Sequence, residues 1–481
     1  MNARRRVVVA GGGITGLAAA YRLLARGEGR LDVTLLEASP RLGGSLLTIR
    51  RDGYVFDGGP DAFVAAKPHA TRLCEELGLG GELMGTRPES RRVYFRKNGR
   101  LFHLPEGLVL AVPTQFWPLV TSPLFSLGAV LRMGLDLVAR GEPPERDESI
   151  ASFLRRHLGQ EAVDVLGEPL LGGIYSGDPH QLSVRATFPQ LVELERKHGS
   201  LVRGAIAQRA SAPKQAPGAV PKSMFQALRG GMATLPERLA ERIRALGGAI
   251  RTEARVEAIR ENPGEFAIET SIGSEPIPCD ELIVALPAPA AARLLAPLDR
   301  EAGRALETVP HVSTATCLLA YERADVPHPL DAAGVLLPKS EGRQASALTF
   351  MSSKWDHRAP EGKALLRVFF GGYAHPEVRD LADDALLAMA REELRVVLGV
   401  EAAPATWEVF RWNDCRPQPI VGHLDRVRLV RERLAARRGA SGPGLEVAGG
   451  PYDGVGIPDC IRQADEAAGR VLERLREAAA P

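Results

Sequence analysis

Residues 1–37 alternate short apolar runs with glycine-rich and polar positions in a pattern that predicts a strand, a helix and a second strand. Val7–Ala10 is short, β-branched and wholly apolar, which is typical of a buried strand. Leu17–Leu24 has the apolar content of a helix, and Val33–Leu36 has that of the next strand. A Gly-x-Gly-x-x-Gly motif beginning at Gly11 joins the first strand to the helix, and Glu37 ends the second strand. This order predicts a dinucleotide-binding βαβ unit.

Each residue of this motif has a physical role in such a unit. Gly11 makes the tight turn, Gly13 lets the backbone approach a pyrophosphate, and Gly16 lets the helix lie close to the sheet. The pyrophosphate lies at the helix N-terminus, where free N–H groups and the helix dipole favour anions. Glu37 accepts hydrogen bonds from a ribose diol and repels a 2′-phosphate, so we do not expect NADP at this site.

The same stretch has a second interpretation, an export signal, because three arginines precede its apolar run. The run is interrupted by three consecutive glycines at 11–13, which the apolar core of a signal would tolerate poorly. The strand, helix and acid that follow at the right spacing favour the dinucleotide-binding interpretation.

Further along the chain, apolar spacing predicts a mainly helical segment over about 100–205 and alternating strands over about 300–425. Residues 207–222 are rich in Pro, Ala and Ser, which predicts a mobile loop. Near the C-terminus, Leu445–Ala448 is predicted to be a strand, and a glycine turn and a helix starting at Pro458 follow it. The two ends of the chain therefore share one architecture, and we expect them to form one domain interrupted by inserts.

Composition and charge narrow the function classes. A hydrophobic share of 45% and a charged share of 25% are ordinary for a soluble globular protein. The net charge of +2 gives no strong field for nucleic acid, which we do not expect as a partner. The five cysteines are scattered and form no Cys-x-x-Cys motif, so we expect no metal site. An odd, dispersed set of cysteines suggests a reducing compartment and hence the cytoplasm.

One long segment, from Gly107 to Leu131, contains no charged residue. It is long enough to span a bilayer, but Pro113, Pro118 and Pro123 interrupt it and argue against a transmembrane helix. The segment is either buried helix and loop lining an apolar pocket, or a surface that touches a membrane or admits a greasy substrate. We favour the buried interpretation, and the two are compatible.

Several of these motifs together resemble one superfamily. The glycine motif, Glu37, Arg41-x-Gly43-Gly44 and Gly58-Gly59-Pro60 resemble the flavin amine oxidases, a superfamily that also holds carotene desaturases and porphyrinogen oxidases. Three longer stretches, 168–201, 352–367 and 450–463, are similar to the protoporphyrinogen/coproporphyrinogen III oxidases of haem biosynthesis. The similarity runs nearly end to end and is nearest to the Gram-positive-type coproporphyrinogen III oxidases.

The resemblance implies non-covalent FAD and a six-electron oxidation of a porphyrinogen to a porphyrin, with molecular oxygen as the acceptor. It also implies an α/β fold in which a discontinuous Rossmann-like FAD-binding domain is joined to a mixed-sheet substrate domain and a helical insert domain. The expected boundaries are 1–85, 223–290 and 433–481 for the FAD-binding domain, 86–99 and 291–432 for the substrate domain, and 100–206 for the helical domain. Peripheral contact with the inner face of the membrane and a homodimer are left open.

The resemblance assigns FAD-binding roles motif by motif. The pyrophosphate would lie at the first glycine turn, the adenosine ribose at Glu37, the adenine at the backbone of Val256, and the flavin ring beside Trp412 and the last glycine loop. The full set of expected cofactor residues is Gly11, Gly13, Thr15, Gly16, Glu37, Arg41, Gly43, Gly44, Gly59, Val256, Trp412, Gly449, Val455, Gly456 and Ile457. No side chain is assigned as a catalytic acid, base or nucleophile, because flavin N5 performs the chemistry.

Substrate-binding roles are assigned in the same way. Arg92 matches an arginine that pairs with a propionate, and Lys67 resembles a lysine of the Gram-positive-type enzymes, although either could be an ordinary surface cation. Gly173 belongs to a pocket strand in the "GGIYSGD" stretch. The remaining expected substrate contacts form an apolar clamp on the tetrapyrrole: Leu336, Phe350 and Phe369. The two phenylalanines could instead be plain core, which is the usual role of an aromatic residue in a strand.

Two rival functions are weighed against this one. An amine oxidase or a carotenoid desaturase would share the cofactor, but the aromatic share of 5% and the "YDGVGIPDC" loop do not favour an amine oxidase. A non-catalytic carrier with a flavoprotein fold would not need every FAD turn. If the protein is a porphyrinogen oxidase, the motifs leave coproporphyrinogen III and protoporphyrinogen IX as alternative substrates. We favour coproporphyrinogen III.

Overall fold

A parallel five-stranded sheet lies at the centre of one end of the molecule. The structure is a computed structural model that describes residues 4–138, 145–211, 223–437 and 442–479. All neighbouring strands of this sheet run parallel. Their order is β12 (Ala249–Arg251), β2 (Leu31–Leu36), β1 (Arg5–Ala10), β16 (Glu281–Val284) and β22 (Gly444–Val447). Strands from both ends of the chain thus build one Rossmann-type sheet, which confirms the predicted α/β fold class.

Helices cover both faces of this sheet, and the alternation of side chains along the strands explains why. Val7 and Val9 point to one face and Val8 and Ala10 to the other, and all four are buried. The first face packs on α1 (Ile14–Arg26), α2 (Pro68–Glu76), α11 (Thr234–Ala245) and α17 (Ile457–Ala479). The second packs on α12 (Ala288–Leu295), α13 (Arg300–Glu307), α16 (His423–Arg437) and the small sheet β13-β14-β15 (Val256–Asn262, Glu265–Thr270, Ile277–Cys279).

The second face corrects the expected domain boundaries. The sequence places 291–432 in the substrate domain, yet the buried residues of α13 and α16 belong to the core of the parallel sheet. Leu306 and Val430 pack there beside Leu282 and Val284. The reason is that these helices carry apolar stripes that need a partner, and the parallel sheet exposes a whole apolar face to them.

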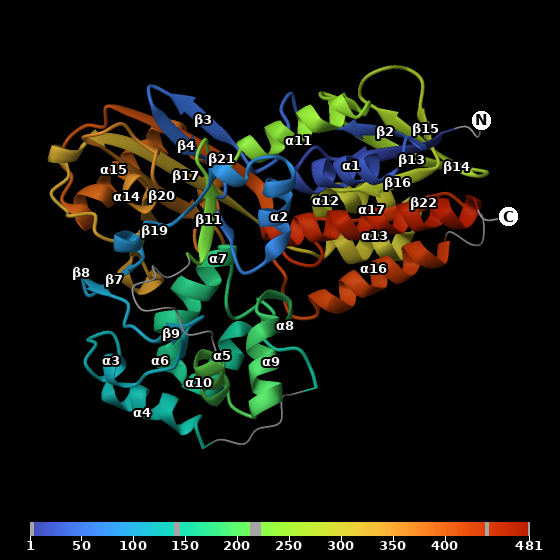
Figure 1. The fold of residues 1–481 in the computed structure, drawn as a ribbon. Coiled ribbons are helices and arrows are strands. Elements are labelled where there is room, and N and C mark those ends of the chain that lie inside the picture. Colours follow the sequence, from blue (N-terminus) through green and yellow to red (C-terminus); the bar gives the residue numbers. More distant parts are fainter. Residues whose placement is uncertain (1–3, 139–144, 212–222, 438–441, 480–481) are drawn as a thin grey trace.

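A mixed seven-stranded sheet forms the second part of the molecule (Figure 1). Its order is β21 (Thr406–Pro417), β17 (His311–Glu322), β20 (Lys363–Gly371), β19 (Ala345–Phe350), β18 (Gly334–Leu336), β7 (Tyr94–Lys97) and β8 (Arg100–His103). Only the β7–β18 pair is parallel. The helix α15 (Asp383–Leu398) covers one face. Strand β8 belongs to this sheet but lies inside the expected helical range 100–206. The expected boundary between the substrate domain and the helical domain, at residue 100, is therefore wrong by one strand.

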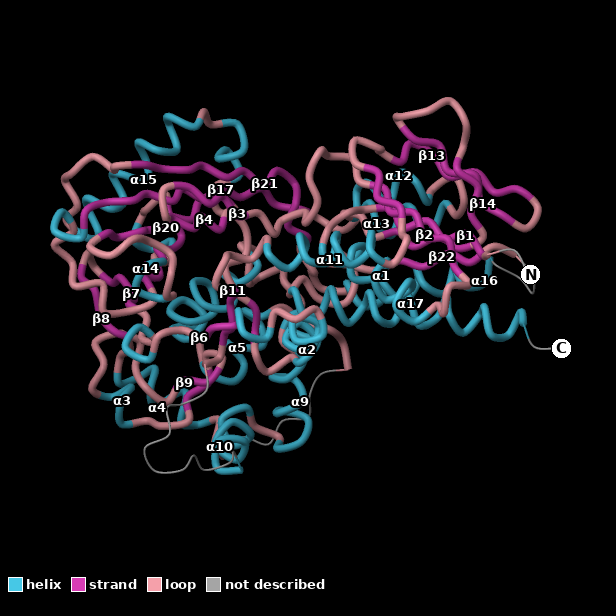
Figure 2. Tube along the Cα trace, turned by 45° about the horizontal axis from the view of Figure 1, so that its top comes forward, coloured by secondary structure: helices cyan, strands magenta, loops and turns pink. Residues whose placement is uncertain are grey.

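Short elements join the two sheets (Figure 2). They are the hairpin β3-β4 (Thr48–Arg51, Tyr54–Asp57), the sheet β5-β11-β6 (Phe63–Val64, Phe225–Leu228, Leu83–Gly85), helix α14 (Met351–Lys354) and the 3₁₀ turns Gly80–Glu82 and Pro88–Ser90. The other 3₁₀ turns, Arg323–Asp325, Lys339–Glu341 and Pro376–Asp380, follow strands β17, β18 and β20 within the seven-stranded sheet. The segment from Asp57, the last residue of β4, to Asp61 leads from the hairpin toward β5.

The third part is helical and lies below the two sheets in Figure 1. It contains the hairpin β9-β10 (Leu108–Val109, Val112–Pro113), α3 (Trp117–Val120), α4 (Leu127–Leu135), α5 (Ile150–Leu158), α6 (Gln160–Ala162), a π-helix (Val163–Gly172), α7 (Gly173–Tyr175), α8 (Val184–Thr187), α9 (Pro189–His198) and α10 (Leu201–Ser211). The loop predicted over 207–222 is wrong for its first five residues, because α10 continues to Ser211; residues 212–222 lie outside the described part of the chain.

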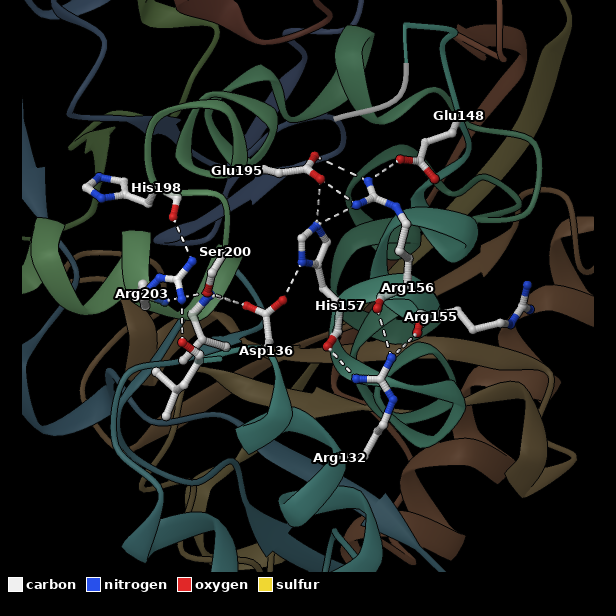
Figure 3. Close-up of polar contacts among 12 residues, drawn as sticks. Arg132, Asp136, Glu148, Arg155, Arg156, His157, Glu195, His198, Ser200 and Arg203 are labelled. Carbon is white, nitrogen blue, oxygen red and sulfur yellow. Dashed lines mark hydrogen bonds and ion pairs between the residues drawn. The ribbon is translucent and has the colours of Figure 1, made fainter. Parts of the chain in front are cut away.

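A buried charge network holds these helices together (Figure 3). His157 on α5 has Nδ1 2.6 Å from Asp136, at the end of α4, and Nε2 3.2 Å from Glu195 on α9. Asp136 also accepts hydrogen bonds from the Ser200 hydroxyl at 2.7 Å and the Val202 N–H at 2.8 Å. The two carboxylates raise the pKa of His157 above its ordinary value in spite of its burial.

The uncharged segment 107–131 is only partly buried. On α4, Val130 and Met133 face the core, whereas Leu127, Leu131 and Leu135 point outward at helical spacing. Leu131 is 73% exposed, and Trp117 on α3 is 75% exposed. The purely buried interpretation is therefore wrong for α3 and α4, which present an apolar stripe to the surroundings.

Candidate functional site

The turn between β1 and α1 has the geometry that a pyrophosphate requires. Gly11 has φ +112°, a conformation that favours glycine, and a Cβ added to Gly16 would lie 1.8 Å from the Gly11 carbonyl oxygen. A Cβ added to Gly13 would meet no protein atom within 4 Å, so this side of the turn is open. Gly13 is also the N-cap of α1, whose first turn carries no capping side chain and no acid. Its N–H groups are thus free to bind an anion.

Glu37 lies beside this turn, at the end of β2. Its carboxylate accepts hydrogen bonds from the N–H of Gly12 at 2.7 Å and from the N–H and hydroxyl of Ser39 at 2.8 Å. The N–H of Ala254 donates to the Glu37 carbonyl, which brings the start of β13, Val256, next to the same corner. The expected ribose and adenine residues therefore lie together.

The Arg41–Gly44 loop packs directly on the first turn. The Gly43 N–H donates to the Gly12 carbonyl at 2.8 Å, and a Cβ on Gly44 would lie 3.2 Å from the Gly13 Cα. Arg41 donates to the Gly44 carbonyl at 2.7 Å, and its guanidinium lies 5.8 Å from the centre of the Trp412 ring. This loop thus connects the phosphate turn with the mixed sheet.

The turn after β22 completes the same corner. Gly449 has φ +126°, and a Cβ there would lie 3.5 Å from the Thr15 hydroxyl oxygen. The loop then reaches Val455, which packs partly against the core of the helical part, and Gly456; α17 begins at the buried Ile457. The N-termini of α1 and α17 therefore flank one site at the carboxyl ends of β1, β16 and β22, where ligands of parallel sheets bind.

These residues fit FAD. The structure brings the expected cofactor residues, scattered over more than 400 positions of sequence, to one corner with an uncapped helix N-terminus, an open glycine turn and a carboxylate. Gly59 adds a close approach, because a Cβ there would lie 1.8 Å from the Ser45 carbonyl oxygen. An FAD bound here would have its pyrophosphate at the N-terminus of α1 and its ribose at Glu37.

One face of the mixed sheet looks toward this corner, and three side chains from neighbouring strands meet at a single carbonyl group there. The Gly58 carbonyl accepts hydrogen bonds from Thr316 Oγ1 on β17 and Trp412 Nε1 on β21, both at 3.0 Å, and from Arg367 Nη2 on β20 at 3.1 Å. These three hydrogen bonds hold the loop that contains Gly58 against the mixed sheet. Trp412 was expected at this place, whereas Thr316 and Arg367 were not.

The register of the sheet separates the expected substrate residues. Leu336 is paired with Ala347 and Ala347 with Phe369, so these side chains share one face. Arg367, two residues before Phe369, is on that face too, and its guanidinium lies 4.4 Å from the centre of the Phe369 ring. Phe350 is paired with Leu366 and points to the opposite face, where it is completely buried in the core against α15. Its expected contact with substrate is therefore wrong, and it is a plain core residue.

A group of charged residues missed by sequence reasoning holds the loop from Asp57 to Asp61. Arg358 lies 3.1 Å from Asp57, and both side chains are fully buried. Lys354 Nζ and Trp355 Nε1 each donate to Asp61 at 2.8 Å. Nearby cations hold the pKa of Asp61 well below its usual range, although burial acts in the opposite direction. The available signal was the family-like stretch 352–367, which contains all of these partners.

The other expected substrate residues are more scattered. Arg92 is exposed just before β7, and its carbonyl accepts the N–H of Ala333 at 2.8 Å. Gly173 is exposed at the start of the short helix α7, so its expected placement in a strand is wrong: the π-helix before it continues directly into α7. Lys67 precedes α2 and pairs with Asp459 on α17, at 2.6 and 2.7 Å.

Fold and site together define a flavoprotein of the amine oxidase type. The model of the family "flavin containing amine oxidoreductase" matches residues 14–472, nearly the whole chain. A wild-type putrescine oxidase bound to putrescine has the same fold, with a TM-score of 0.68 and 19% identity over 98% of this chain and 99% of that one. The chain therefore belongs to the flavin-containing amine oxidoreductase family.

More similar relatives place the chain within that family. It is 34% identical to the coproporphyrinogen III oxidase of Bacillus subtilis (strain 168), over 98% of this chain and 99% of the relative. It is 30% identical to the chloroplastic protoporphyrinogen oxidase 1 of Spinacia oleracea, over 98% and 84%. A crystal structure from Exiguobacterium sp. 255-15, provisionally named a protoporphyrinogen oxidase, has a TM-score of 0.84 and 32% identity over 98% and 99%. The chain is an FAD-dependent oxidoreductase of the porphyrinogen oxidase group.

Proposed function

We propose that this protein binds FAD non-covalently and oxidises coproporphyrinogen III to coproporphyrin III. The observation that carries the choice of substrate is the similarity, over nearly the full length, to coproporphyrinogen III oxidases of Bacillus subtilis and Propionibacterium freudenreichii, at 34% and 36% identity. The reaction removes six electrons and six protons, and three molecules of oxygen accept them to give three of hydrogen peroxide.

The residues of the chain bind and orient, and the cofactor supplies the redox chemistry. The chemistry that a bound FAD would supply is acceptance of hydride from a substrate carbon and transfer of the electrons to oxygen. The first turn of α1 and Glu37 would hold its dinucleotide part, and Arg41 and Trp412 lie where the loops meet the mixed sheet. Phe369 and Leu336 give the facing sheet an apolar surface that orients a tetrapyrrole and excludes water.

The test compares kcat/KM for coproporphyrinogen III and protoporphyrinogen IX in one aerobic assay with purified protein. We expect fluorescent porphyrin, hydrogen peroxide and no requirement for NAD, with coproporphyrinogen III preferred by tenfold or more. A preference for protoporphyrinogen IX would overturn the choice of substrate and favour the second candidate, to which the plant relatives at 30% identity point. Oxidation of a polyamine with no action on either porphyrinogen would overturn the proposal altogether.

We also propose that the protein works in the cytoplasm with the α3–α4 stripe resting on the inner face of the membrane. Trp117, Leu127, Leu131 and Leu135 are all more than half exposed. The first three belong to the segment from Gly107 to Leu131, which has no charged residue, and Leu135 continues the stripe one turn beyond it. Large exposed apolar patches mark surfaces for a membrane or a protein partner. Among the described residues, no helix has both the length and the apolar character needed to cross a bilayer.

A further inference from the structure

The loop from Asp57 to Asp61 is surrounded by more positive than negative charge. Asp57 is paired with Arg358 at 3.1 Å, and Asp61 with Lys354 at 2.8 Å. Arg367 is a third cation in the same group, and within the described part of the chain no carboxylate lies close enough to form an ion pair with it. Three cations therefore lie around two carboxylates. Asp61 and Asp57 attract Arg367 at longer range, but each of them is in direct contact with another cation, so the group keeps an excess of one positive charge.

The unpaired charge of Arg367 is deeply buried. The side chain is 3% exposed, and its only hydrogen bond within the described residues runs from Nη2 to the Gly58 carbonyl. Its Nε is a buried donor with no partner there. Burial lowers the pKa of Arg367 to about 10, so the guanidinium remains charged at neutral pH.

Keeping an unpaired cation out of water costs free energy, so an anion is expected to meet it when the site is filled. Two features indicate where that anion lies. Arg367 shares the Gly58 carbonyl with Trp412, which belongs to the corner that fits FAD, and it shares a sheet face with Phe369. The charge thus lies at the junction between the cofactor corner and the apolar sheet face.

We propose that Arg367 is a positioning residue whose charge stabilises the negative charge of the reduced flavin. The inference rests on the proposed function only in requiring FAD in the corner described above. The hydrogen bond to Gly58 holds the guanidinium in place, and Phe369 packs against it on the sheet face. A fixed buried cation favours an anion nearby without reorganising at the moment of reaction. Reduction of the bound flavin then becomes more favourable.

The experiment measures the midpoint potential of FAD in the purified holoprotein, without substrate. Arg367→Met removes the charge, and we expect it to lower the equilibrium constant for two-electron reduction by roughly tenfold, which corresponds to about 30 mV. Arg367→Lys keeps a cation and is expected to retain most of the potential. Thr316→Val is the matched control, because it removes another hydrogen bond to the Gly58 carbonyl and leaves the charge in place.

The alternatives give different results. If Arg367→Met and Thr316→Val shift the potential equally, or Arg367→Met leaves it unchanged, the proposal is wrong and the residue is structural. If the potential is unchanged but KM for a carboxylated porphyrinogen rises, the guanidinium binds substrate, which also overturns it. Should Arg367→Met fail to fold, the potential of Arg367→Lys is followed over a pH series beside the wild type. Burial lowers the pKa of a lysine at this position below that of the arginine, so the potential of the lysine variant should fall below that of the wild type as the pH rises. A wild type without FAD would contradict the proposed function instead.

Discussion

The ammonium group of Lys67 lies 2.6 and 2.7 Å from the two carboxylate oxygens of Asp459. Lys67 immediately precedes α2, and Asp459 is in the first turn of α17, 392 residues later in the chain. Asp459 also packs under the loop expected at the flavin, because a Cβ on Gly456 would lie 2.8 Å from its Oδ2. The pair therefore places a compensated charge beside the proposed cofactor site rather than a free cation at the rim.

This pair changes what we expect of Lys67. Sequence reasoning made it a partner for a propionate that only coproporphyrinogen III offers, whereas a lysine already paired with Asp459 has little charge left for a substrate. We predict that Lys67→Ala lowers kcat/KM for both porphyrinogens by the same factor, about two- to fivefold, since exposed ion pairs contribute ~1 kcal/mol or less. The double variant Lys67→Ala with Asp459→Asn should recover part of the lost kcat/KM, because it removes the carboxylate left without its partner. A loss confined to coproporphyrinogen III would show instead that Lys67 binds a propionate.

Gly13 provides a specific test of the FAD corner. Its φ of −72° suits any residue, and an added Cβ meets no protein atom within 4 Å, so Gly13→Val should fold normally. The same side chain would occupy the space of the pyrophosphate, and we predict a colourless protein whose melting temperature equals that of the wild type freed of FAD. Gly16→Val is the contrasting variant, because its Cβ would lie 1.8 Å from the Gly11 carbonyl oxygen and should prevent folding. A yellow Gly13→Val protein would refute the pyrophosphate assignment.

Arg92 is predicted to bind a propionate present in both substrates. Because the side chain is exposed, water weakens the interaction, and Arg92→Ala should lower kcat/KM for both porphyrinogens by about tenfold or less. Most of the loss should appear in KM. Arg100→Ala, at another exposed position on the neighbouring strand, should have no effect. Equal behaviour of the two variants would make Arg92 an ordinary surface arginine.

The His157 network predicts a pH dependence of stability. The pKa of His157 is higher in the folded protein than in the unfolded chain, where it is about 6.5. The stability that protonated His157 contributes is therefore fully present below pH 6.5 and is lost as the pH rises through the pKa of the folded state. Asp136 and Glu195 have lowered pKa values, so their contribution is lost in acid instead. We expect His157→Gln to destabilise the protein by about 3–5 kcal/mol near pH 6 and by less at pH 9. Unfolding in urea at the two pH values measures the difference, and a constant difference would mean that His157 does not titrate.

The α3–α4 stripe predicts binding to lipid vesicles. Wild-type protein should sediment with vesicles of phosphatidylglycerol and phosphatidylethanolamine, and the double substitution Leu131→Ser with Leu135→Ser should release it. The matched control carries Leu424→Ser and Leu429→Ser, which are also exposed leucines but lie on α16. If the stripe variant changes the molecular mass in solution and not vesicle binding, the stripe is a subunit interface of a homodimer.

Local features of the fold could be predicted from the sequence because they depend on neighbours in the chain. Val7–Ala10, the glycine turn and the helix after it were predicted within a few residues of β1 and α1. The final helix begins at Ile457, one residue before the predicted Pro458. The predicted domain boundaries were wrong where a segment could pack on either of two cores. Helices α13 and α16 pack on the parallel sheet, because its second face presents an apolar surface to them.

The sequence by itself determined the α/β class, the glycine turn between β1 and α1, and the family, since each of these depends on motifs that act through their own turn of backbone. Only the tertiary structure decided which faces and partners the other residues have. The register of β19 against β20 turned Phe350 into the core and left Phe369 on the opposite face, which also carries Arg367. Lys67 and Asp459, like Gly58 and Arg367, are separated by hundreds of residues and meet through sheet pairing and packing. Such contacts depend on how distant segments align, which the spacing of residues along one segment does not encode.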